Sequence, residues 1–222
     1  MKDFKNKYKK HFGNRQFVMS VLIGIGLLLL SFVVNFYAGT YATEKASNHV
    51  NDIILSNIPV YDVDFTFIYG PLFIWFFVAT LCIHEPKKIP FVLKSIALFI
   101  FIRSIFITLT HIGPFPDQIV FSNDSTDWIN NFAFGGDLFF SAHTGLPFLM
   151  ALVFGKNLLL KIIFTVSAVF FGIVVLLGHL HYSIDVISAF FITYTIFHIA
   201  EKLFKKDREM FLSTPTDPTD LL

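Results

Sequence analysis

Apolar residues gather in six segments of 17 to 24 residues, and short polar stretches separate each segment from the next. A helix needs roughly 20 apolar residues to cross the hydrocarbon core of a bilayer, so the expected fold is an all-α, polytopic membrane helix bundle with six spans. The first run follows a basic start, as in a signal peptide, but it exceeds the roughly 7–15 residues of a typical signal-peptide core and favours a retained span. The predicted spans are Phe17–Ala38, Phe65–Ile83, Pro90–Ile112, Leu138–Phe154, Leu158–Leu177 and His181–Phe204.

The composition agrees with a membrane protein. Of the 222 residues, 55% are hydrophobic and 15% are charged, against a norm of roughly 25% charged. A soluble domain of this size could not bury so much apolar surface. The formal net charge is only +1, so nucleic acid is not an expected partner. The single cysteine, Cys82, lies inside an apolar run and is expected to serve packing.

Lysine and arginine residues alternate between the two sides of the predicted bundle. They fill the start of the chain, the second and fourth connections and the end of the chain, whereas the first loop (39–64) holds a single lysine and the third loop (113–137) holds no basic residue. By the positive-inside rule both termini are cytoplasmic. The expected domains are a basic cytoplasmic segment (1–16), a six-span membrane catalytic domain (17–204) and a cytoplasmic tail (205–222).

Two histidines and an aspartate stand near the extracytoplasmic ends of the fourth and sixth predicted spans. His181 and Asp185 are four residues apart, so on a helix they share a face and the carboxylate can hold the imidazole in one tautomer. A nucleophilic histidine needs such a partner, because one ring nitrogen must stay deprotonated and aimed. His143 enters from another span at the same depth and can act as the complementary acid. The three residues therefore predict a catalytic site for displacement at phosphorus.

Arg103 lies in the body of the third predicted span. A guanidinium there costs roughly 2.5–3.5 kcal/mol on insertion scales, so it should face a partner or a polar cavity. We predict that it binds a phosphate group, whose oxygens match the planar fork of the guanidinium; pairing with a carboxylate of another span is the alternative. His179 has no carboxylate four residues later and is expected to line or support the site, while His111 stays open between support and packing.

Two other kinds of function use similar residues. His143, His181 and Asp185 could ligate zinc, but no His-x-x-x-His pair accompanies them, and we expect neither a metal nor another cofactor. Intramembrane charges also mark transport pathways. The second, fourth and fifth predicted spans hold almost no ionisable side chain near their middle, however, and the two halves of the chain do not repeat. An enzyme is therefore favoured over a transporter.

The motifs around these residues resemble a known family. Ser141–Thr144 (Ser-Ala-His-Thr) is similar to the Ser-Gly-His-Thr motif of the sphingomyelin synthase family, which belongs to the type 2 phosphatidic acid phosphatase superfamily. The stretch His179–Val186 is similar to that family's His-x-His-Tyr-Thr-x-Asp-Val signature. Asp137 falls where the family has an acidic residue after glycine, and Arg103 resembles the arginine of its third span. The likeness covers about residues 94–204.

The resemblance implies six spans, cytoplasmic termini and a set of residue roles. His181 would attack phosphorus, Asp185 would orient it and His143 would protonate the departing alcohol, with Asp137, Ser141 and His179 in supporting positions. The family moves a phosphocholine or phosphoethanolamine headgroup from a glycerophospholipid to ceramide and leaves diacylglycerol, and some members act as phospholipase C. The expected partners are therefore a membrane phospholipid donor and a lipid-alcohol acceptor of the ceramide or diacylglycerol type.

The chain also departs from the wider superfamily. Its phosphatases carry an arginine six residues before the nucleophilic histidine, where this chain has Val175, and Ser104 replaces the proline expected after the arginine of the first motif. A site with so little positive charge suits a diester with one negative charge better than a phosphomonoester dianion. The sequence thus predicts transfer of a phospholipid headgroup through a phosphohistidine intermediate, with hydrolysis as a lipid phosphatase or phospholipase C at the same site as the alternative.

Overall fold

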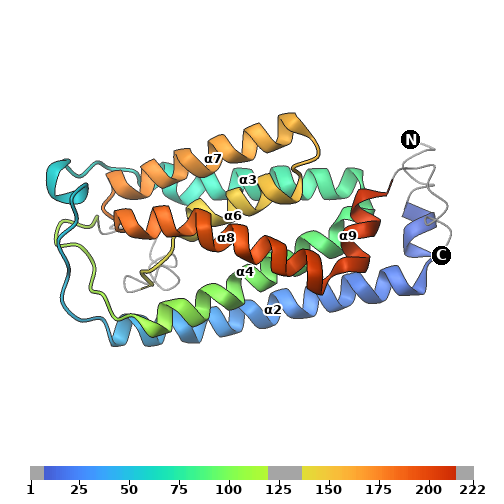
Figure 1. Cartoon of the computed structure of the whole chain (residues 1–222), viewed down its shortest axis with the longest axis horizontal. Coiled ribbons are helices and arrows are strands. Elements are labelled where there is room, and N and C mark those ends of the chain that lie inside the picture. Colours follow the sequence, from blue (N-terminus) through green and yellow to red (C-terminus); the bar gives the residue numbers. More distant parts are fainter. Residues whose placement is uncertain (1–7, 120–136, 214–222) are drawn as a thin grey trace.

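The structure is a computed structural model, and it describes residues 8–119 and 137–213. Within these ranges the chain is helical and contains no strand, which confirms the all-α prediction. Six helices run along the long axis of an elongated bundle, and a seventh, α9, turns back at one end (Figure 1). Two single-turn 3-10 helices, η1 (Leu55–Asn57) and η2 (Pro86–Lys88), lie in the connections. The helices are α2 (Arg15–Glu44), α3 (Asp64–His84), α4 (Ile89–Leu109), α6 (Ala142–Val153), α7 (Leu158–Leu177), α8 (Ser183–Leu203) and α9 (Lys205–Leu212).

The two ends of the bundle carry different chain segments. The end on the left of Figure 1, here called the site end, is formed by residues 45–63, 110–119 and 178–182. The opposite end, here called the basic end, carries the N-terminal helical residues 8–12 and α9. Alternate connections therefore lie at the same end, as expected for helices that run up and down in turn.

The surface of the bundle is apolar, as a lipid-facing surface is. Side chains such as Phe73, Phe76 and Phe191 are each 72% exposed, although phenylalanine normally lies inside a soluble protein. Five helices, α2, α3, α4, α7 and α8, are long and apolar enough to cross a membrane, with the η2 turn counted at the start of α4. These features fit an integral, multi-pass membrane protein.

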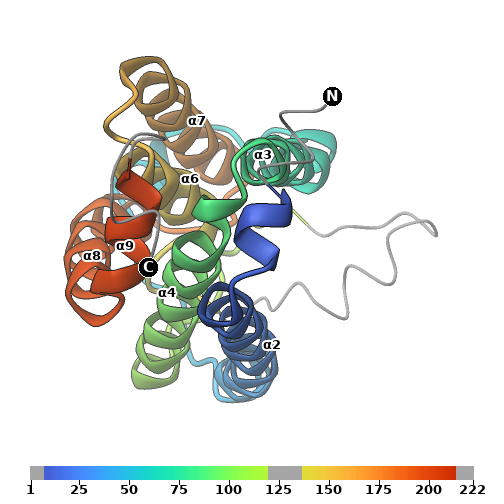
Figure 2. The same cartoon turned by 90° about the vertical axis from the view of Figure 1, so that its right-hand side faces the viewer.

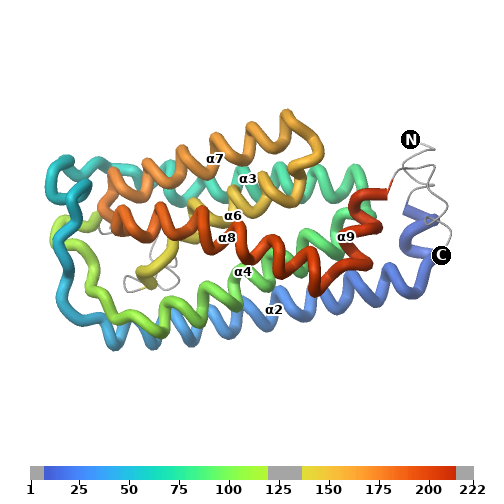
Figure 3. The backbone as a smooth tube through the Cα atoms, in the orientation of Figure 1, coloured from blue at the N-terminus to red at the C-terminus, as the bar shows by residue number. Residues whose placement is uncertain are grey.

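The fourth predicted span is shorter than expected. Its sequence is apolar from Leu138 to Phe154, but the helix α6 begins only at Ala142 and has 12 residues, or about 18 Å of helix. Residues 137–141 before it are irregular and pass between α4 and α8 (Figure 3). The structure thus provides five full-length candidate spans and one short apolar helix, where the sequence predicted six spans.

Side chains from neighbouring helices stabilise the irregular segment. Arg103 on α4 donates hydrogen bonds to the backbone carbonyls of Asp137 (3.1 Å) and Phe140 (3.2 Å). The hydroxyl of Ser188 on α8 donates to the carbonyl of Phe139 (3.1 Å). Non-helical backbone is tolerated at membrane depth only where its polar groups are satisfied within the protein. These bonds explain how span four can break next to the candidate site.

The helices pack unequally. α2 lies along α4, and α6 packs between α7 and α8, whereas α3 packs mainly against α7 and η2. Close approach to α6 depends on Gly145: a Cβ there would lie 2.7 Å from the ring of Phe99 and 2.9 Å from the hydroxyl of Thr193. Helices α4 and α8 therefore close on α6 within one turn of His143.

The basic end contains a buried charge cluster. Lys94 on α4 forms a salt bridge of 2.6 Å with Asp207 on α9, and the hydroxyl of Ser20 on α2 donates to the other carboxylate oxygen at 2.5 Å. Lys94 also donates to Ser20 at 2.7 Å. These three residues, here called the closed cluster, connect α9 to the bundle. The predicted tail therefore begins with an ordered helix, and its part beyond residue 213 lies outside the described residues.

Candidate active site

His181 lies in the turn that joins α7 to α8, and backbone hydrogen bonding fixes this turn. The N–H of His179 donates to Leu176 O (3.0 Å) and that of Leu180 donates to Val175 O (2.8 Å), the pattern of a Schellman motif after the C-cap Gly178. His179 accordingly has a left-handed φ of 52°, a position that glycine usually occupies. The chain then turns sharply and α8 begins at Ser183.

His181 therefore precedes α8, and the prediction that it shares a helical face with Asp185 is wrong. The two side chains nevertheless meet, with His181 Nδ1 3.1 Å from Asp185 Oδ2. The reason is helix capping: Asp185 sits in the first turn of α8, and the same Oδ2 accepts the backbone N–H of Tyr182 at 3.0 Å. The carboxylate reaches back over the helix start and meets the imidazole there.

This pairing defines the tautomer of His181. A carboxylate that is wholly buried accepts the proton on Nδ1, which leaves the lone pair on Nε2. No hydrogen bond to a described residue engages Nε2. His181 is itself 5% exposed, so Nε2 is shielded from solvent, and its role as a nucleophile stays a prediction.

His143 lies in the first turn of α6, next to the start of α8. The backbone N–H of Ser141 donates to Asp185 O at 3.2 Å, which ties the two helix starts together. His143 lies within electrostatic range of His181, and it interacts with the backbone of Phe67. Its ring stacks on the Phe67 ring with centroids 4.0 Å apart. The structure thus brings His143, His181 and Asp185 together.

Several buried polar atoms around these three residues have no hydrogen-bond partner among the described residues. They are Asp185 Oδ1, Ser141 Oγ, Thr144 Oγ1 and both ring nitrogens of His179. An unpaired buried polar group costs about 1–3 kcal/mol, so native structures rarely leave several together. Spare hydrogen-bonding capacity of this kind is what a site for a polar ligand provides.

Arg103 is engaged by the protein itself. Its Nη2 lies 2.8 Å from Asp137 Oδ2, its Nη1 donates to Asn35 Oδ1 at 3.3 Å, and two further bonds reach the carbonyls of the irregular segment. The structural pairing considered from the sequence is therefore present. Arg103 also lies within electrostatic range of His143, and its role in phosphate binding stays a prediction.

A set of contacts that sequence reasoning missed holds the turn at His181. Asp52, from the first loop, accepts the N–H of Ser183 through Oδ2 (2.7 Å) and caps η1 through Oδ1. The buried Tyr182 donates its hydroxyl to Gly113 O (2.8 Å) in the third loop. We call Asp52, Tyr182 and Gly113 the loop clasp. An aspartate three residues before Leu55 indicates a local cap, but no sequence signal connects it to residue 183.

The pKa shifts of Asp52 and Tyr182 favour the hydrogen bonds of the loop clasp. Burial alone would raise the pKa of Asp52, but the hydrogen bonds from Ser183, Leu55 and Ile54 outweigh it and bring the pKa below the usual 3.8. Burial raises the pKa of Tyr182, so its hydroxyl stays a donor at neutral pH. Asp52 is therefore a permanent acceptor for the start of α8.

Two further histidines make ring contacts with aromatic neighbours. His111 contacts the ring of Tyr41 at 5.5 Å, and His179 contacts Phe115 at 5.2 Å. Among residues 8–119 and 137–213, no three His, Cys, Asp or Glu side chains are grouped as a metal site would require.

The fold and the site together define a class: a polytopic membrane protein with a buried histidine–aspartate pair near a second histidine. Residues 135–202 match the family model described as PAP2 superfamily C-terminal. This range is less than a third of the chain and contains His143, His181 and Asp185. The match supports the type 2 phosphatidic acid phosphatase superfamily, whose members are phosphoesterase enzymes. No curated protein matches the chain, and no solved structure does.

Proposed function

We propose that this protein is a membrane lipid phosphotransferase that moves a phospholipid headgroup, of the phosphocholine or phosphoethanolamine type, to a lipid alcohol such as ceramide. The observation that carries the proposal is the contact of His181 with Asp185 beside His143, within a chain whose surface is apolar. The superfamily match supports lipid phosphoester chemistry, and the narrower assignment rests on the resemblance to sphingomyelin synthases.

The reaction has two displacements at phosphorus. Nε2 of His181 attacks, a P–N bond forms, and the P–O bond to diacylglycerol breaks while His143 gives its proton to the departing oxygen. The acceptor hydroxyl then attacks the phosphohistidine and returns a proton to His143, and the P–N bond breaks. Asp185 stabilises the charge that develops on His181 during the first step.

The charge around the site favours a diester. Arg103 already faces Asp137 at 2.8 Å, so this ion pair contributes little net positive charge to a ligand. A phosphodiester carries one negative charge, and hydroxyl and imidazole donors of the kind left unpaired at Ser141 and His179 can solvate it. A phosphomonoester dianion would demand more positive charge.

Hydrolysis is the second candidate, because water can replace the acceptor alcohol in the second displacement. The same residues would then act as a phospholipase C or a lipid phosphatase. The buried position of His181, which is 5% exposed, favours transfer, since a shielded intermediate meets water less often. We further propose that the site end faces the extracytoplasmic or luminal side, as the distribution of basic residues predicts.

The test uses the purified chain in vesicles that contain a phospholipid and a labelled ceramide, with products separated by chromatography. Labelled sphingolipid supports transfer, diacylglycerol with a soluble phosphoalcohol supports a phospholipase C, and free phosphate from phosphatidic acid supports a phosphatase. Mass spectrometry of the quenched reaction should find the headgroup phosphate on His181. Flux of a lipid without any covalent product would instead indicate a transporter, and loss of turnover in EDTA with recovery in zinc would contradict the metal-free mechanism.

A further inference from the structure

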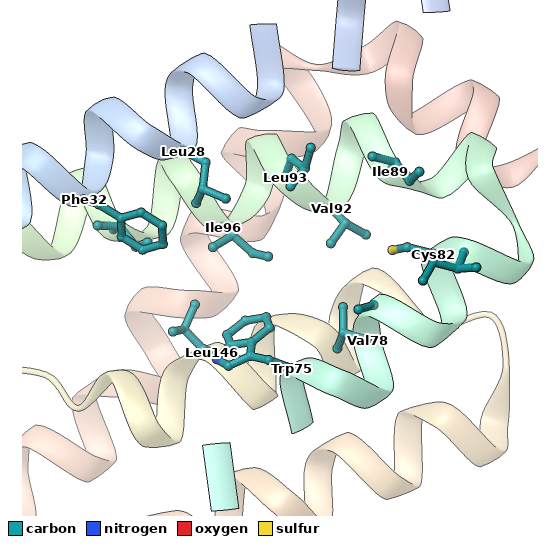
Figure 4. Close-up of a pocket in the computed structure, with 13 residues that line it drawn as sticks. Leu28, Phe32, Trp75, Val78, Cys82, Ile89, Val92, Leu93, Ile96 and Leu146 are labelled. Atoms are coloured by element: carbon teal, nitrogen blue, oxygen red, sulfur yellow. The ribbon is translucent and has the colours of Figure 1, made fainter. Parts of the chain in front are cut away.

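A cavity of about 470 Å³ lies between α2, α3, α4 and α6, on the basic-end side of the candidate site. Its lining consists of apolar side chains with one tryptophan and one cysteine, Trp75 and Cys82, and no charged residue among those described. Figure 4 shows side chains of α2, α3 and α4 pointing into one common space. The volume is in the range of ligand pockets, roughly 300–1,000 Å³.

The cavity adjoins the candidate site. Two of its lining residues, Ile100 and Leu146, lie one helical turn from Arg103 on α4 and from His143 on α6, both on the side away from the site end. From Ile100 the lining continues along α4 to Ile89, about 16 Å along a helix axis. The cavity therefore begins one helical turn from Arg103 and His143 and extends toward the basic end.

The cavity also has a lateral opening and a closed end. Phe32 on α2 is 52% exposed and Ile83 on α3 is 49% exposed, so lining residues face the surrounding lipid between these two helices. At the basic end the hydroxyl of Tyr8 donates to Ile83 O at 3.0 Å, and Figure 2 shows helical residues 8–12 between the ends of α2 and α3. An acyl chain that enters between α2 and α3 would therefore end against residues 8–12 and Ile83.

We propose that this cavity holds one acyl chain of the phospholipid whose headgroup occupies the His143–His181 site. The inference rests on the proposed function and adds a binding site for the substrate's apolar part. Since lipid tails are as apolar as leucine, entry gives no hydrophobic gain, and shape complementarity sets the selectivity. The length of the cavity therefore selects acyl chains by length. The bound chain also positions the phosphorus atom in front of His181.

The experiment uses the full chain in vesicles containing a phospholipid with a diazirine at the far end of one acyl chain. Photolabelling should map to the facing stretches of α3 and α4 that line the cavity. Ala79→Phe, which fills the cavity from α3, should reduce this labelling and lower turnover of long-chain relative to short-chain phospholipid, each by roughly tenfold. Val166→Phe is the matched control, because Val166 is 61% exposed on α7 and does not line the cavity; it should change neither quantity.

Three outcomes separate the possibilities. If a diazirine alkane without a headgroup labels the same stretches equally well, the cavity is a lipid-filled crevice and the proposal is overturned. Turnover without labelling of the cavity, or with a chain-length preference unchanged by Ala79→Phe, also overturns it and leaves the proposed function intact. Labelling that requires a phospholipid headgroup, in a chain that turns over no phosphoester, supports the cavity as a phospholipid site and overturns the proposed function.

Discussion

Two buried clusters of charged and polar residues lie at opposite ends of the bundle. In the closed cluster of the basic end, the ammonium group of Lys94 and both carboxylate oxygens of Asp207 have partners, and Ser20 links the two. Desolvating these charges is expensive, and the cost is offset because the geometry pairs every group. Among the described residues, each charged or polar group of this cluster thus has a partner within the cluster.

The cluster at the site end is organised differently. Asp185 holds His181 and the start of α8 with one oxygen, while its other oxygen has no partner among the described residues. The Ser141 hydroxyl is fully buried and also lacks a hydrogen-bond partner within residues 8–119 and 137–213. The comparison teaches that burial and charge alone do not mark a functional site; unused donors and acceptors next to a reactive side chain do.

Loss of the proposed nucleophile should have the largest effect. His181→Ala is expected to lower turnover by at least about 10³-fold, because no other described side chain is held by a buried carboxylate at that position. The free energy of unfolding in detergent should fall by no more than about 1.5–3 kcal/mol, the value of one hydrogen bond to a charged group, since the remaining carboxylate still caps α8. Turnover close to that of the wild type would show that His181 is not the nucleophile.

Loss of the proposed acid should depend on the leaving group. His143→Gln is expected to lower turnover of a phospholipid by about 10²–10⁴-fold. With a nitrophenyl phosphodiester, whose leaving group needs no proton, the same variant should lose much less. Equal losses on the two substrates would contradict an acid role and assign His143 to substrate positioning.

The closed cluster should respond in the opposite way. Lys94→Met leaves the buried carboxylate of Asp207 without a cation, so the free energy of unfolding should fall by about 3–5 kcal/mol. Turnover per folded molecule should be unchanged, and the double variant Lys94→Met with Asp207→Leu should recover much of the stability. Denaturant unfolding in micelles measures this. A loss of turnover in the double variant, with its stability restored, would mean that the two ends are coupled.

The loop clasp should give an intermediate effect. Asp52→Asn keeps one acceptor oxygen but replaces the other with an NH2 group, which must face either the N–H of Ser183 or those of Ile54 and Leu55. Each lost bond to a charged group is worth about 1.5–3 kcal/mol. Turnover should fall about tenfold through misplacement of His181, with folding retained. Full turnover in the Asp52→Asn protein would contradict a positioning role for the clasp.

Acid unfolding gives a second measurement on the same variant. The folded-state pKa of Asp52 lies below the unfolded value near 3.8, so its contribution to stability is fully present above that value and is lost as the pH falls through the folded pKa. The wild type should therefore lose more stability than Asp52→Asn on acidification below about pH 3.8. Parallel acid unfolding curves of the two proteins would argue against a depressed pKa at this position.

Asp52 also illustrates what the sequence could not provide. The three residues proposed for catalysis could be picked out because each lies in a short local motif, and their catalytic role stays a prediction. Five of the six predicted spans could be recognised from length and hydropathy. The bond between Asp52 and Ser183 joins positions 131 residues apart, and nothing local to either residue specifies it. A tertiary contact of this kind appears only when the loops are folded together.

The break in span four is a second case. The run from Leu138 to Phe154 is mostly apolar, so hydropathy predicts one helix. Arg103 and Ser188 nevertheless bind the carbonyls of its first residues and hold them out of the helix. Tertiary partners here override the local pattern. The same limit explains why His181 was predicted inside a helix that begins two residues later.

The smallest expected effects come from removing one serine hydroxyl in each cluster. Ser20→Ala deletes a hydroxyl that bridges Lys94 and Asp207, so it should lower the free energy of unfolding by about 1.5–3 kcal/mol and leave turnover per folded molecule unchanged. Ser141→Ala deletes a hydroxyl with no partner among the described residues, so the free energy of unfolding should change by less than about 0.5 kcal/mol. Its turnover should fall roughly tenfold, because a phosphoryl oxygen loses a donor.

Burial alone predicts the reverse order of stabilities. Ser141 is fully buried, whereas Ser20 is only half-buried, so a loss of packing would weigh more heavily at Ser141. A larger destabilisation from Ser20→Ala can therefore come only from the hydrogen bonds that its hydroxyl makes. If Ser141→Ala destabilised the protein as much as Ser20→Ala does and kept full turnover, the unpaired hydroxyl would be part of the packing. The distinction between the two clusters would then fail.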